Sequence, residues 1–315
     1  MEITKGHRRY AAIDIGSNAA RLLIKELAGV TDGNRPVLKK LILVRVPLRL
    51  GKDVFATGKI SRGKRHDLLR LMKAYRQLLL VYGVDAVRAC ATSAMRDACN
   101  SGKIIARIRS KTGIAIEIID GAQEARIVFN NRLECMPDTQ SAVLFMDVGG
   151  GSTEINLAAG GKLVYSSSFN LGTLRMLAGK TDPCEMTRFT RRIAKLRDEY
   201  GNLALIGSGG NINKIYKLSD EKDCRRKSLP VSALEKLLEE MRPLDVEERM
   251  SRFNLRADRA DVIVPAAELF LKAASAAGCS EIIVPMVGVS DGIIDGLVMR
   301  DLRDNTLSDA LRGPA

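Results

Sequence analysis

The chain has 315 residues, of which 46% are hydrophobic and 28% are charged. This length predicts about two domains of roughly 150 residues each, and the ordinary composition excludes a disordered or low-complexity chain. The first residues are polar and basic and lack the long apolar segment of a secretory signal, and no stretch reaches the roughly eighteen apolar residues of a membrane-spanning helix. We therefore expect a cytoplasmic protein with no membrane role.

The positive charge is concentrated in the first part of the sequence. The formal net charge is +13; residues 1–130 carry 25 Lys and Arg against 11 Asp and Glu, whereas the remainder carries 25 against 26. Such a field attracts polyanions, namely nucleic acid, polyphosphate or a highly phosphorylated nucleotide. A basic surface that serves only solubility is the alternative. Nucleic acid is the weakest of these partners, because the chain has no Trp and only 4% aromatic residues to stack on bases.

Counting residues excludes metal sites built on nitrogen or sulfur. The chain contains only two histidines, His7 and His66, and its six cysteines show no C-x-x-C spacing. Any bound metal must therefore be held by oxygen ligands, which points to Mg²⁺, with Mn²⁺ as the second choice.

Strands and helices alternate along the chain. Residues 51–70 are expected to form a polar loop that leads into an amphipathic helix, and the apolar run 41–44 suits a buried strand. Besides the strands around the glycine turns described below, the pattern predicts strands at residues 86–90, 114–119, 203–206 and 282–285, and helices near residues 97–112, 212–218, 231–241, 260–274 and 291–302. This alternation predicts an α/β fold.

An approximate internal duplication organises the sequence. Residues 10–24 and residues 143–157, about 133 positions later, both consist of a buried strand, an acidic residue, a glycine turn with hydroxyl side chains and a second strand. We therefore place two domains at residues 1–130 and 131–315, with a cleft between them. The terminal helix, at about residues 291–315, is expected to pack back on the first domain.

The two glycine turns are the predicted phosphate-binding elements. A strand that ends in an aspartate and a glycine turn places a carboxylate at the sheet edge, where ligands of α/β proteins bind. Glycines let backbone N–H groups approach phosphate oxygens, and hydroxyl groups add donors. One such turn alone is more often purely structural, but two acidic turns that face one cleft would hold a phosphate from both sides. The predicted phosphate-binding residues here are Gly16, Ser17, Asn18, Gly149, Gly150, Gly151, Ser152 and Thr153.

Three carboxylates are candidate ligands for Mg²⁺, namely Asp14, Asp147 and Glu154. Magnesium commonly takes one or two carboxylates and leaves its other positions to water and phosphate. Glu154 lies among apolar residues on the strand after the second turn, and the alternative for it is a strand position that simply faces outward.

Two further segments place charged side chains near helix starts. Arg96 follows a strand and opens a helix, where a guanidinium can clamp a phosphate beside the free N–H groups; a capped helix start without a ligand is the alternative. Asp120 and Gln123 have the spacing of a capping box, which leaves Glu124 free to face the cleft as a general base. A first-turn glutamate that only complements the helix dipole is the alternative.

A third glycine segment lies between a predicted strand and a predicted helix. Its residues Gly209 and Gly210 form either a third phosphate or nucleotide loop or a structural turn, and the two interpretations stay open. The motif G-x-x-x-x-G-K-[ST] is absent, so a P-loop is not supported.

Six segments together resemble the exopolyphosphatase and guanosine pentaphosphate phosphatase family, which is similar to actin, sugar kinases and heat-shock ATPases. The matching stretches, in the family's order and spacing, are AAIDIGSNAARLLI, RACATSAMRDACN, IIDGAQEARIVF, FMDVGGGSTEINL, LIGSGGNINKI and RADRADVIVPAAELF. They cover nearly the whole chain. The resemblance implies the short form of the family, with two actin-like (ribonuclease H-like) domains, and it implies a homodimer.

The resemblance also implies roles for individual residues. Glu124 matches the catalytic glutamate that activates water, and Arg96 matches an arginine that contacts phosphate. Asp147 and Glu154 resemble the acidic pair that serves the metal and the water.

Two positions depart from the family pattern. Gln123 stands where the family often has a second glutamate, but the matched catalytic acid is retained. Ser290 stands where many relatives carry arginine, which suggests an altered substrate preference.

The expected function is that of an exopolyphosphatase, which releases terminal orthophosphate from inorganic polyphosphate by metal-assisted attack of water. The nearest rival is a guanosine pentaphosphate 5′-phosphohydrolase, which performs the same chemistry on a nucleotide. An actin-like kinase that uses ATP and a non-catalytic sensor of alarmone nucleotides are further alternatives. Retention of Glu124, Glu154 and both turns speaks against the sensor.

Overall fold

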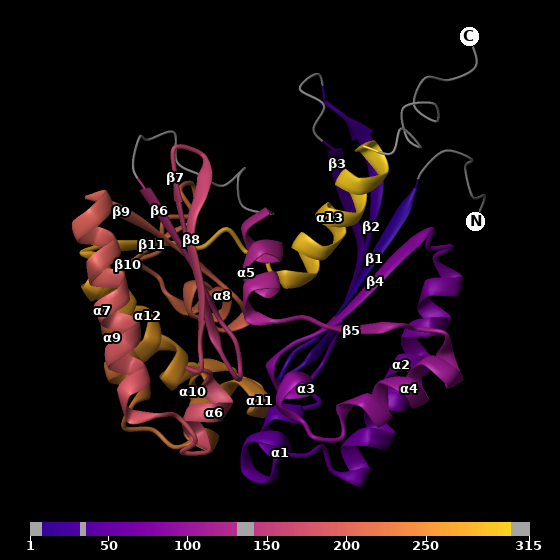
Figure 1. The fold of residues 1–315 in the computed structure, drawn as a ribbon. Coiled ribbons are helices and arrows are strands. Elements are labelled where there is room, and N and C mark those ends of the chain that lie inside the picture. Colours follow the sequence, from indigo (N-terminus) through magenta and orange to yellow (C-terminus); the bar gives the residue numbers. More distant parts are fainter. Residues whose placement is uncertain (1–7, 32–35, 131–141, 304–315) are drawn as a thin grey trace.

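The structure, a computed structural model, describes residues 8–31, 36–130 and 142–303. They form two lobes, each built on one mixed β-sheet with helices packed against it (Figure 1). This arrangement confirms the predicted α/β class.

The sheet of the first lobe has the strand order β3-β2-β1-β4-β5. Strands β1 and β2, and β2 and β3, are antiparallel, whereas β4 runs parallel to β1 and β5 parallel to β4. The strands are β1 (Arg9–Ile15), β2 (Ala20–Val30), β3 (Pro36–Val46), β4 (Ala86–Ala91) and β5 (Ile116–Ile118). The helices of this half of the chain are α1 (Leu50–Thr57), α2 (Arg62–Val81), α3 (Ser93–Asp97), α4 (Ser101–Thr112) and α5 (Gly121–Asn130).

The sheet of the second lobe repeats this topology. Its order is β10-β11-β9-β6-β7-β8, so β6, β7, β8 and β9 take the places of β1, β2, β3 and β4 with the same relative directions. The predicted duplication is therefore confirmed in the fold. The strands are β6 (Ala142–Val148), β7 (Thr153–Ala159), β8 (Lys162–Phe169), β9 (Leu203–Ser208), β10 (Ser228–Pro230) and β11 (Glu281–Ile283). The helices that follow β8 are α6 (Thr173–Leu177), α7 (Pro183–Tyr200), α8 (Gly210–Leu218), α9 (Val231–Met241), α10 (Val246–Phe253), α11 (Ala257–Ala260), α12 (Ile263–Ala277) and α13 (Val289–Arg303).

Side chains that alternate along β1 build two separate cores. Ala11 and Ile13 belong to a cluster formed with buried residues of α2 and α4. Tyr10 and Ala12 point the other way and pack with residues of α13. Since successive side chains of a strand face opposite sides of its sheet, a strand that is apolar throughout must be covered on both faces.

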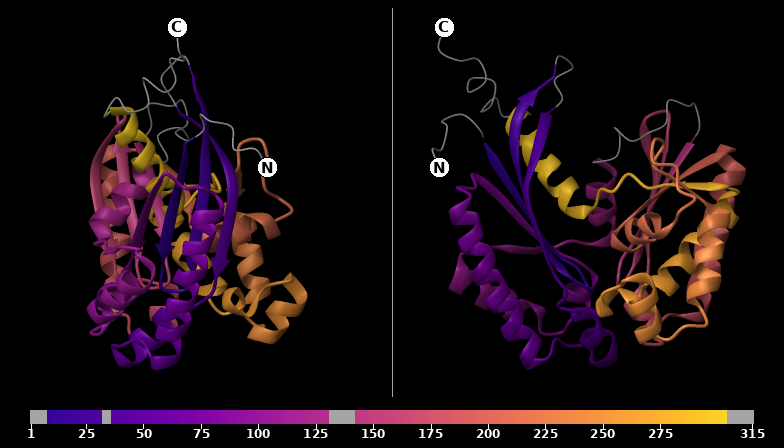
Figure 2. Two further views of the ribbon diagram at one scale, coloured as in Figure 1. Left: turned by 90° about the vertical axis from the view of Figure 1, so that its right-hand side faces the viewer. Right: turned by 180° about the vertical axis from the view of Figure 1, so that it is seen from behind.

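The last helix returns to the first lobe. α13 lies along the first sheet, on the face opposite α2 and α4 (Figure 1, Figure 2). The ion pair of Lys25 with Asp291 (2.8 Å) and the hydrogen bond from the Tyr10 hydroxyl to Asp301 (3.0 Å) attach its two ends. The second half of the sequence therefore completes the core of the first sheet.

Several expected elements differ from the observed ones. The predicted polar loop 51–70 contains a helix, α1, because Leu50, Val54 and Phe55 form a buried face while the charged residues between them lie outside. The expected helix 97–112 begins only at Ser101, as α4, and Asp97 ends the separate short helix α3. The two helices are separated because Ala98 is extended and the side chain of Asn100 bonds to both backbone groups of Ile60.

Two further predictions required correction. The apolar run 41–44 lies in β3, at the edge of the sheet, and Leu43 is exposed rather than buried. The expected helix 260–274 corresponds to α12, which begins at Ile263, and Ala260 belongs to the separate short helix α11.

The expected domain boundary falls on residues 131–141, which lie outside the described residues. On either side of it, the first sheet ends with β5 and the second begins with β6, while α5 packs against β7, β8 and α13. Among the described residues, none of the helices combines the length and the apolar character that crossing a bilayer requires.

Two glycines of α13 test how closely this helix packs. A Cβ on Gly292 would lie 2.1 Å from the carbonyl oxygen of Ile127 in α5, whereas a Cβ on Gly296 meets nothing within 4 Å. We expect Gly292→Ala to lower the free energy of unfolding by about 1–3 kcal/mol or more through overpacking. Gly296→Ala, the control on the same helix, should raise it by about 0.5–1 kcal/mol through helix propensity. Chemical denaturation measures both, and equal effects would contradict the close packing.

Candidate active site

The two glycine turns have the same local structure. In the first, the amide of Gly16 donates to the carbonyl oxygen of Ala19 (3.1 Å); in the second, the amide of Gly149 donates to that of Ser152 (2.9 Å). Each turn connects the central strand of its sheet to an antiparallel neighbour. The duplicated sequence therefore produces two equivalent turns, one from each lobe.

A helix start holds each turn by its carbonyl groups. The carbonyl oxygens of Ser17 and Asn18 accept hydrogen bonds from the amides at the start of α1, from Gly51 and Arg49 respectively (both 2.8 Å). The carbonyl oxygens of the second turn accept in the same way from the start of α6. In a trans peptide the C=O of one residue and the N–H of the next point in opposite directions. The N–H groups that share a peptide bond with these carbonyls consequently point away from α1 and α6, which favours their use as anion donors, whereas the amides of Gly16 and Gly149 already donate within the turns.

The two turns touch each other. A Cβ on Gly150 would lie 3.0 Å from Cβ of Ser17 and 3.3 Å from the amide nitrogen of Asn18. The hydroxyl of Ser17 bonds to that of Ser93 (2.7 Å) and accepts from the amide of Ala94 (3.2 Å). A side chain at position 150 would have to push these neighbours aside by a few tenths of an ångström, so glycine favours the close approach of the two turns.

The third glycine segment joins the same region. Gly209 has φ 98° and a Cβ there would lie 3.2 Å from Oδ1 of Asp147. A Cβ on Gly210 would lie 2.7 Å from the guanidinium of Arg259, which also donates to the side-chain oxygen of Asn211. The missing side chains therefore make room for a carboxylate and for a guanidinium.

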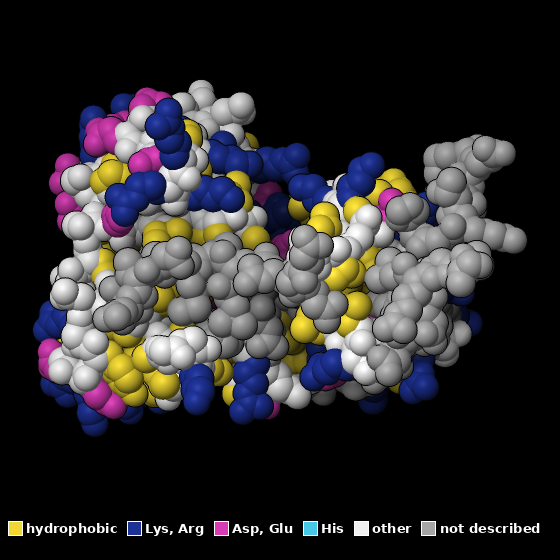
Figure 3. Space-filling view, turned by 90° about the horizontal axis from the view of Figure 1, so that it is seen from above, with side chains coloured by type: hydrophobic (Ala, Val, Ile, Leu, Met, Phe, Trp, Pro, Cys, Tyr) yellow, Lys and Arg dark blue, Asp and Glu magenta, His cyan; other side chains and the backbone are white. Residues whose placement is uncertain are grey.

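All three segments line one cavity of about 520 Å³ between the lobes. Seen from above, Lys and Arg side chains gather around the hollow between the lobes, with acidic side chains deeper in it (Figure 3). The predicted site residues that line this cavity are Asp14, Gly16, Ser17, Asn18, Glu124, Asp147, Gly149, Gly150, Ser152, Gly209 and Gly210.

Four predicted residues do not line the cavity. Gly151 packs against Ser93. Thr153 is fully buried, and its hydroxyl donates to the carbonyl oxygen of Leu171. Arg96 donates to the carbonyl oxygen of Ile119 (2.8 Å). The fourth, Glu154, is only 1% exposed and is described below.

Asp14 and Asp147 occupy equivalent positions at the ends of β1 and β6. Asp14 pairs with Arg21 (2.6 Å), and Asp147 accepts a hydrogen bond from the hydroxyl of Ser208. Burial raises the pKa of Asp14, the Arg21 guanidinium opposes this, and the negative charge of Asp147 raises the pKa further. The two carboxylates therefore act on each other across the cleft.

Glu124 is the one of these acids whose carboxylate oxygen lacks a partner. It lies in the first turn of α5 and is 8% exposed, and its Oε2 is buried with no hydrogen bond among the described residues. The capping box predicted beside it is confirmed, since Gln123 and Asp120 bond reciprocally (3.0 and 2.7 Å). Burial raises the pKa of Glu124 well above its usual range, and the charges of Glu154 and Asp147 raise it further. Buried carboxylate oxygens are rarely left unpaired, so this one favours a functional role.

Glu154 lies behind the cavity, on the face of β7 that packs against α5. Its neighbours Ile155 and Leu157 point into the core of the second lobe, so alternation directs Glu154 to the opposite face. The hydroxyl of Ser168 donates to Oε1 of Glu154 (2.8 Å). Burial raises the pKa of Glu154 to about 7, although hydrogen bonds from Ser152 and Ser168 oppose the shift. The side chain is buried, and the alternative of an outward-facing strand position does not hold.

The sequence analysis missed three arginines that line the cavity, Arg21, Arg45 and Arg259. Arg45 of β3 pairs with Asp258 of α11 (2.6 Å) and so connects the two lobes. Burial lowers the pKa of Arg259 to about 10, and the charges of Arg45 and Arg21 lower it further. The sequence does contain a signal for Arg259, because this residue lies in the segment RADRADVIVPAAELF, which resembles the family. The resemblance gave no role to the individual residues of that segment.

The donor set fits a magnesium ion that is completed by substrate and water. Among the described residues, no group of three or more His, Cys, Asp or Glu could hold a metal by protein ligands alone. Asp14 and Asp147 nevertheless line one cavity with Glu124. Mg²⁺ is commonly bound through one or two carboxylates together with phosphate and water.

Comparison with known proteins places the chain in a family. The sequence profile of the Ppx/GppA phosphatase family matches residues 30–301. The chain belongs to this family. Exopolyphosphatase 1 of Mycobacterium tuberculosis (strain H37Rv) is 28% identical over 190 residues, which cover 60% of this chain and 53% of that protein. Exopolyphosphatase 2 of the same strain is 33% identical over 174 residues, which cover 53% of each chain. The chain thus spans about half the length of the curated relatives it matches.

Solved structures are similar to this chain over nearly its whole length. The crystal structure of the Aquifex aeolicus member of the Ppx/GppA family gives a TM-score of 0.72 at 26% identity and covers 94% of this chain and 99% of its own. An exopolyphosphatase from Cytophaga hutchinsonii gives a TM-score of 0.76 at 23% identity, with 95% and 98% coverage, and so shows the fold alone. The expected fold of two actin-like domains is confirmed.

The burial of Glu154 predicts a pH-dependent stability. A carboxyl whose pKa is higher in the folded than in the unfolded state stabilises below its unfolded pKa and loses this contribution as the pH rises through the folded pKa. Between pH 4.5 and about 7, wild type should therefore lose stability relative to Glu154→Gln, by an amount on the order of 3 kcal/mol. Thermal melts across this range without divalent cations measure the difference. Glu117→Gln, which removes an exposed carboxylate of the first lobe, is the control; a constant difference between wild type and Glu154→Gln would contradict the assignment.

Proposed function

We propose that the protein is an exopolyphosphatase, which releases terminal orthophosphate from inorganic polyphosphate by metal-assisted attack of water. Two relatives named exopolyphosphatase support this substrate. The rest of the support comes from the cavity, which contains separate groups for holding a phosphate, for compensating its charge and for activating water.

The observation that carries the proposal is the unpaired carboxylate oxygen of Glu124. This oxygen is buried, and Glu124 is one of the residues that line the cavity together with the two turns. A carboxylate whose pKa is raised is a stronger base than an exposed one, and a general base works best when its pKa is near the working pH. Glu124 would accept a proton from the water that attacks the terminal phosphorus.

The terminal phosphate would lie between the two turns. Their N–H groups supply fixed donors for the phosphoryl oxygens, and such preorganised donors are the main contribution to phosphoryl transfer. Arg259 adds a guanidinium from the second lobe, and Arg21 adds another from the first. Neither needs to move far, because Asn211 and Asp14 respectively already hold them.

Asp14 and Asp147 would hold Mg²⁺, or Mn²⁺ in its place. Glu154, which lies behind the cavity, would assist the activation of water through its charge, which raises the pKa of Glu124. The metal would supply Lewis-acid compensation of the phosphate charge. Arg96 lies close enough to lower the pKa values of Glu124 and Glu154, so its charge would limit the repulsion among these acids. On the family resemblance, the protein would act in the cytoplasm as a homodimer.

The lining of the cavity favours polyphosphate over a nucleotide. Among the described residues, no aromatic side chain lines the cavity, so a guanine base would find no ring to stack on. Lys40 and Lys217 line it as well and would suit further phosphates. A guanosine pentaphosphate 5′-phosphohydrolase remains the second candidate, because the buried Ser290 and the exposed Met286 also line the cavity and would offer polar and apolar contacts to a nucleoside. A non-catalytic alarmone sensor is the third.

Replacing the proposed base should slow turnover without weakening binding. Glu124→Gln preserves shape but removes the proton acceptor, so we expect phosphate release to fall by about a hundredfold to ten-thousandfold. Single-turnover phosphate release measures the rate, and Glu117→Gln provides a control with the same chemical change on an exposed carboxylate of the first lobe. Turnover within a few-fold of wild type would remove Glu124 from the mechanism.

Substrate choice is tested by offering polyphosphate, guanosine pentaphosphate and ATP in parallel, with and without Mg²⁺. We expect the highest kcat/KM for polyphosphate and loss of activity when the metal is chelated. Faster release from guanosine pentaphosphate would establish the nucleotide phosphatase instead. Tight nucleotide binding with no release from any of the three substrates would identify a sensor.

A further inference from the structure

A second basic cavity lies on the first lobe, between α2 and α4. Its volume is about 360 Å³, and it shares no lining residue with the cavity between the lobes. Helices α2 and α4 cover the face of the first sheet that is opposite α13 (Figure 1). This cavity, called here the α2–α4 groove, is therefore separate from the proposed active site.

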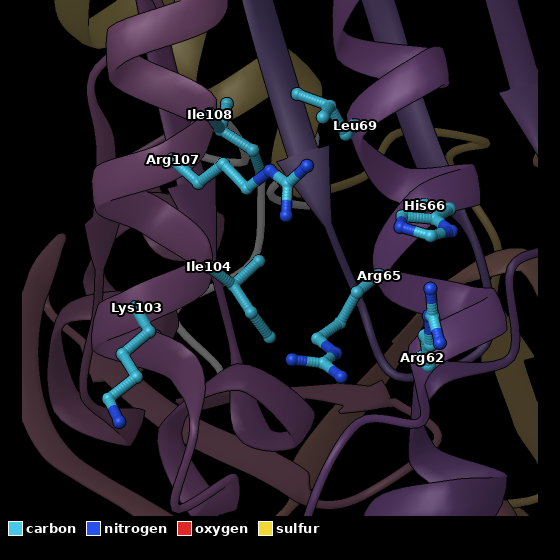
Figure 4. Close-up of a pocket in the computed structure, with 8 residues that line it drawn as sticks. All are labelled: Arg62, Arg65, His66, Leu69, Lys103, Ile104, Arg107 and Ile108. Atoms are coloured by element: carbon cyan, nitrogen blue, oxygen red, sulfur yellow. The ribbon is translucent and has the colours of Figure 1, made fainter.

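The walls of the α2–α4 groove carry four cationic side chains. Arg62 and Arg65 are three residues apart on α2, and Lys103 and Arg107 are four residues apart on α4, so each pair lies on one face of its helix. Arg65 and Arg107 extend from opposite helices into the space between them (Figure 4). His66 lies beside them on α2.

These four charges are not compensated by the protein. No Asp or Glu lines the groove, and within the described ranges none of the four side chains forms an ion pair. Other cations of α2 are paired, Lys64 with Asp53 (3.1 Å) and Arg70 with Asp67 (3.3 Å). Like charges gathered around one groove repel one another, and a bound polyanion relieves this repulsion.

We propose that the α2–α4 groove is a second binding site for inorganic polyphosphate, which anchors a distant part of a chain whose end is held between the lobes. This inference rests on the proposed function of the cavity between the lobes. Guanidinium groups bind phosphate oxygens in pairs and stay charged at every relevant pH. A chain with a charge on every repeat unit can contact both helices at once.

The floor of the groove distinguishes polyphosphate from nucleic acid. It is aliphatic, formed by Leu69, Ile104 and Ile108, and His66 is the only ring in the lining. Proteins that bind single-stranded nucleic acid without sequence preference supply aromatic platforms for the bases. A polyanion without bases needs only the cationic side chains that the groove provides.

Two sites on one protein make affinity depend on chain length. A polyphosphate long enough to reach both binds the second intramolecularly, at a high effective concentration, whereas tripolyphosphate occupies only one. The groove would thus lower KM for long chains and leave kcat unchanged, because it touches no reacting atom.

The test compares two double variants that remove the same charge from the same helices. Arg65→Gln with Arg107→Gln empties the groove of its two inward guanidinium groups. Arg76→Gln with Arg109→Gln is the control, since both arginines are exposed and neither lines the groove. Thermal melts of both variants verify the fold.

Binding is measured with Glu124→Gln in every protein, so that turnover does not enter. For long-chain polyphosphate we expect the groove variant to bind about five- to thirtyfold more weakly and its salt dependence to fall by about 1 to 2 in log–log slope. Affinity for tripolyphosphate should be unchanged, and the control should match wild type. In the active protein, KM for long chains should rise by a similar factor at constant kcat.

Three results would overturn the proposal. An equal loss of affinity in the control would show a diffuse field rather than a site, and an equal loss for tripolyphosphate would show an effect on the cavity between the lobes. Single-stranded nucleic acid that displaces polyphosphate at equal phosphate concentration would identify a different occupant. Failure of the proposed function is recognised separately: a wild-type protein that releases no phosphate but shows groove-dependent binding would retain the groove and lose the hydrolase.

Discussion

The contact between the two glycine turns is the constraint on which the rest of the site depends. Gly150 approaches Ser17 so closely that a Cβ at this position would lie only 3.0 Å from Cβ of Ser17. Each turn is held from behind by the amides of a helix start, α1 in one lobe and α6 in the other, and these bonds orient the remaining N–H groups. Because both turns follow equivalent strands, the duplication of the fold also accounts for the symmetry of the two turns.

The second feature of the site is a concentration of buried negative charge. Burial raises the pKa values of Asp14, Glu124 and Glu154, and the nearby charge of Asp147 raises all three further. Only part of this is offset inside the protein, by Arg21, by Arg96 and by two serine hydroxyls. Such an arrangement costs stability in the free protein, and buried charges without full compensation are a common property of catalytic sites. A bound cation and a phosphate, as proposed above, would compensate this charge.

The fold was predictable to the extent that it depends on local pattern. Glycine turns after apolar strands, and their repetition, predicted two sheets and a cleft. The pattern failed where packing decided the structure. Helix α1 has only three large apolar side chains that are buried, and charged residues and a glycine lie between them. Its helical face can therefore be recognised only when its packing partners in the fold are known. The apolar run 41–44 does not show whether its strand is central or at an edge, because that depends on the neighbouring strands that it meets in the folded sheet.

The sequence by itself determined the residue types of the site, since a carboxylate, a glycine turn and hydroxyl groups must be adjacent in the chain to form each half. It also indicated Glu124 through the capping box that leaves it free. Only the tertiary structure decided which of these groups share a cavity. Arg259 and Asp14 line the same cavity although 245 positions of sequence separate them. The hydroxyl of Thr153 points inward and bonds to the backbone. The α2–α4 groove is formed by two helices that are not adjacent in the sequence. Proximity of this kind depends on how the elements pack, and local sequence patterns carry no record of it.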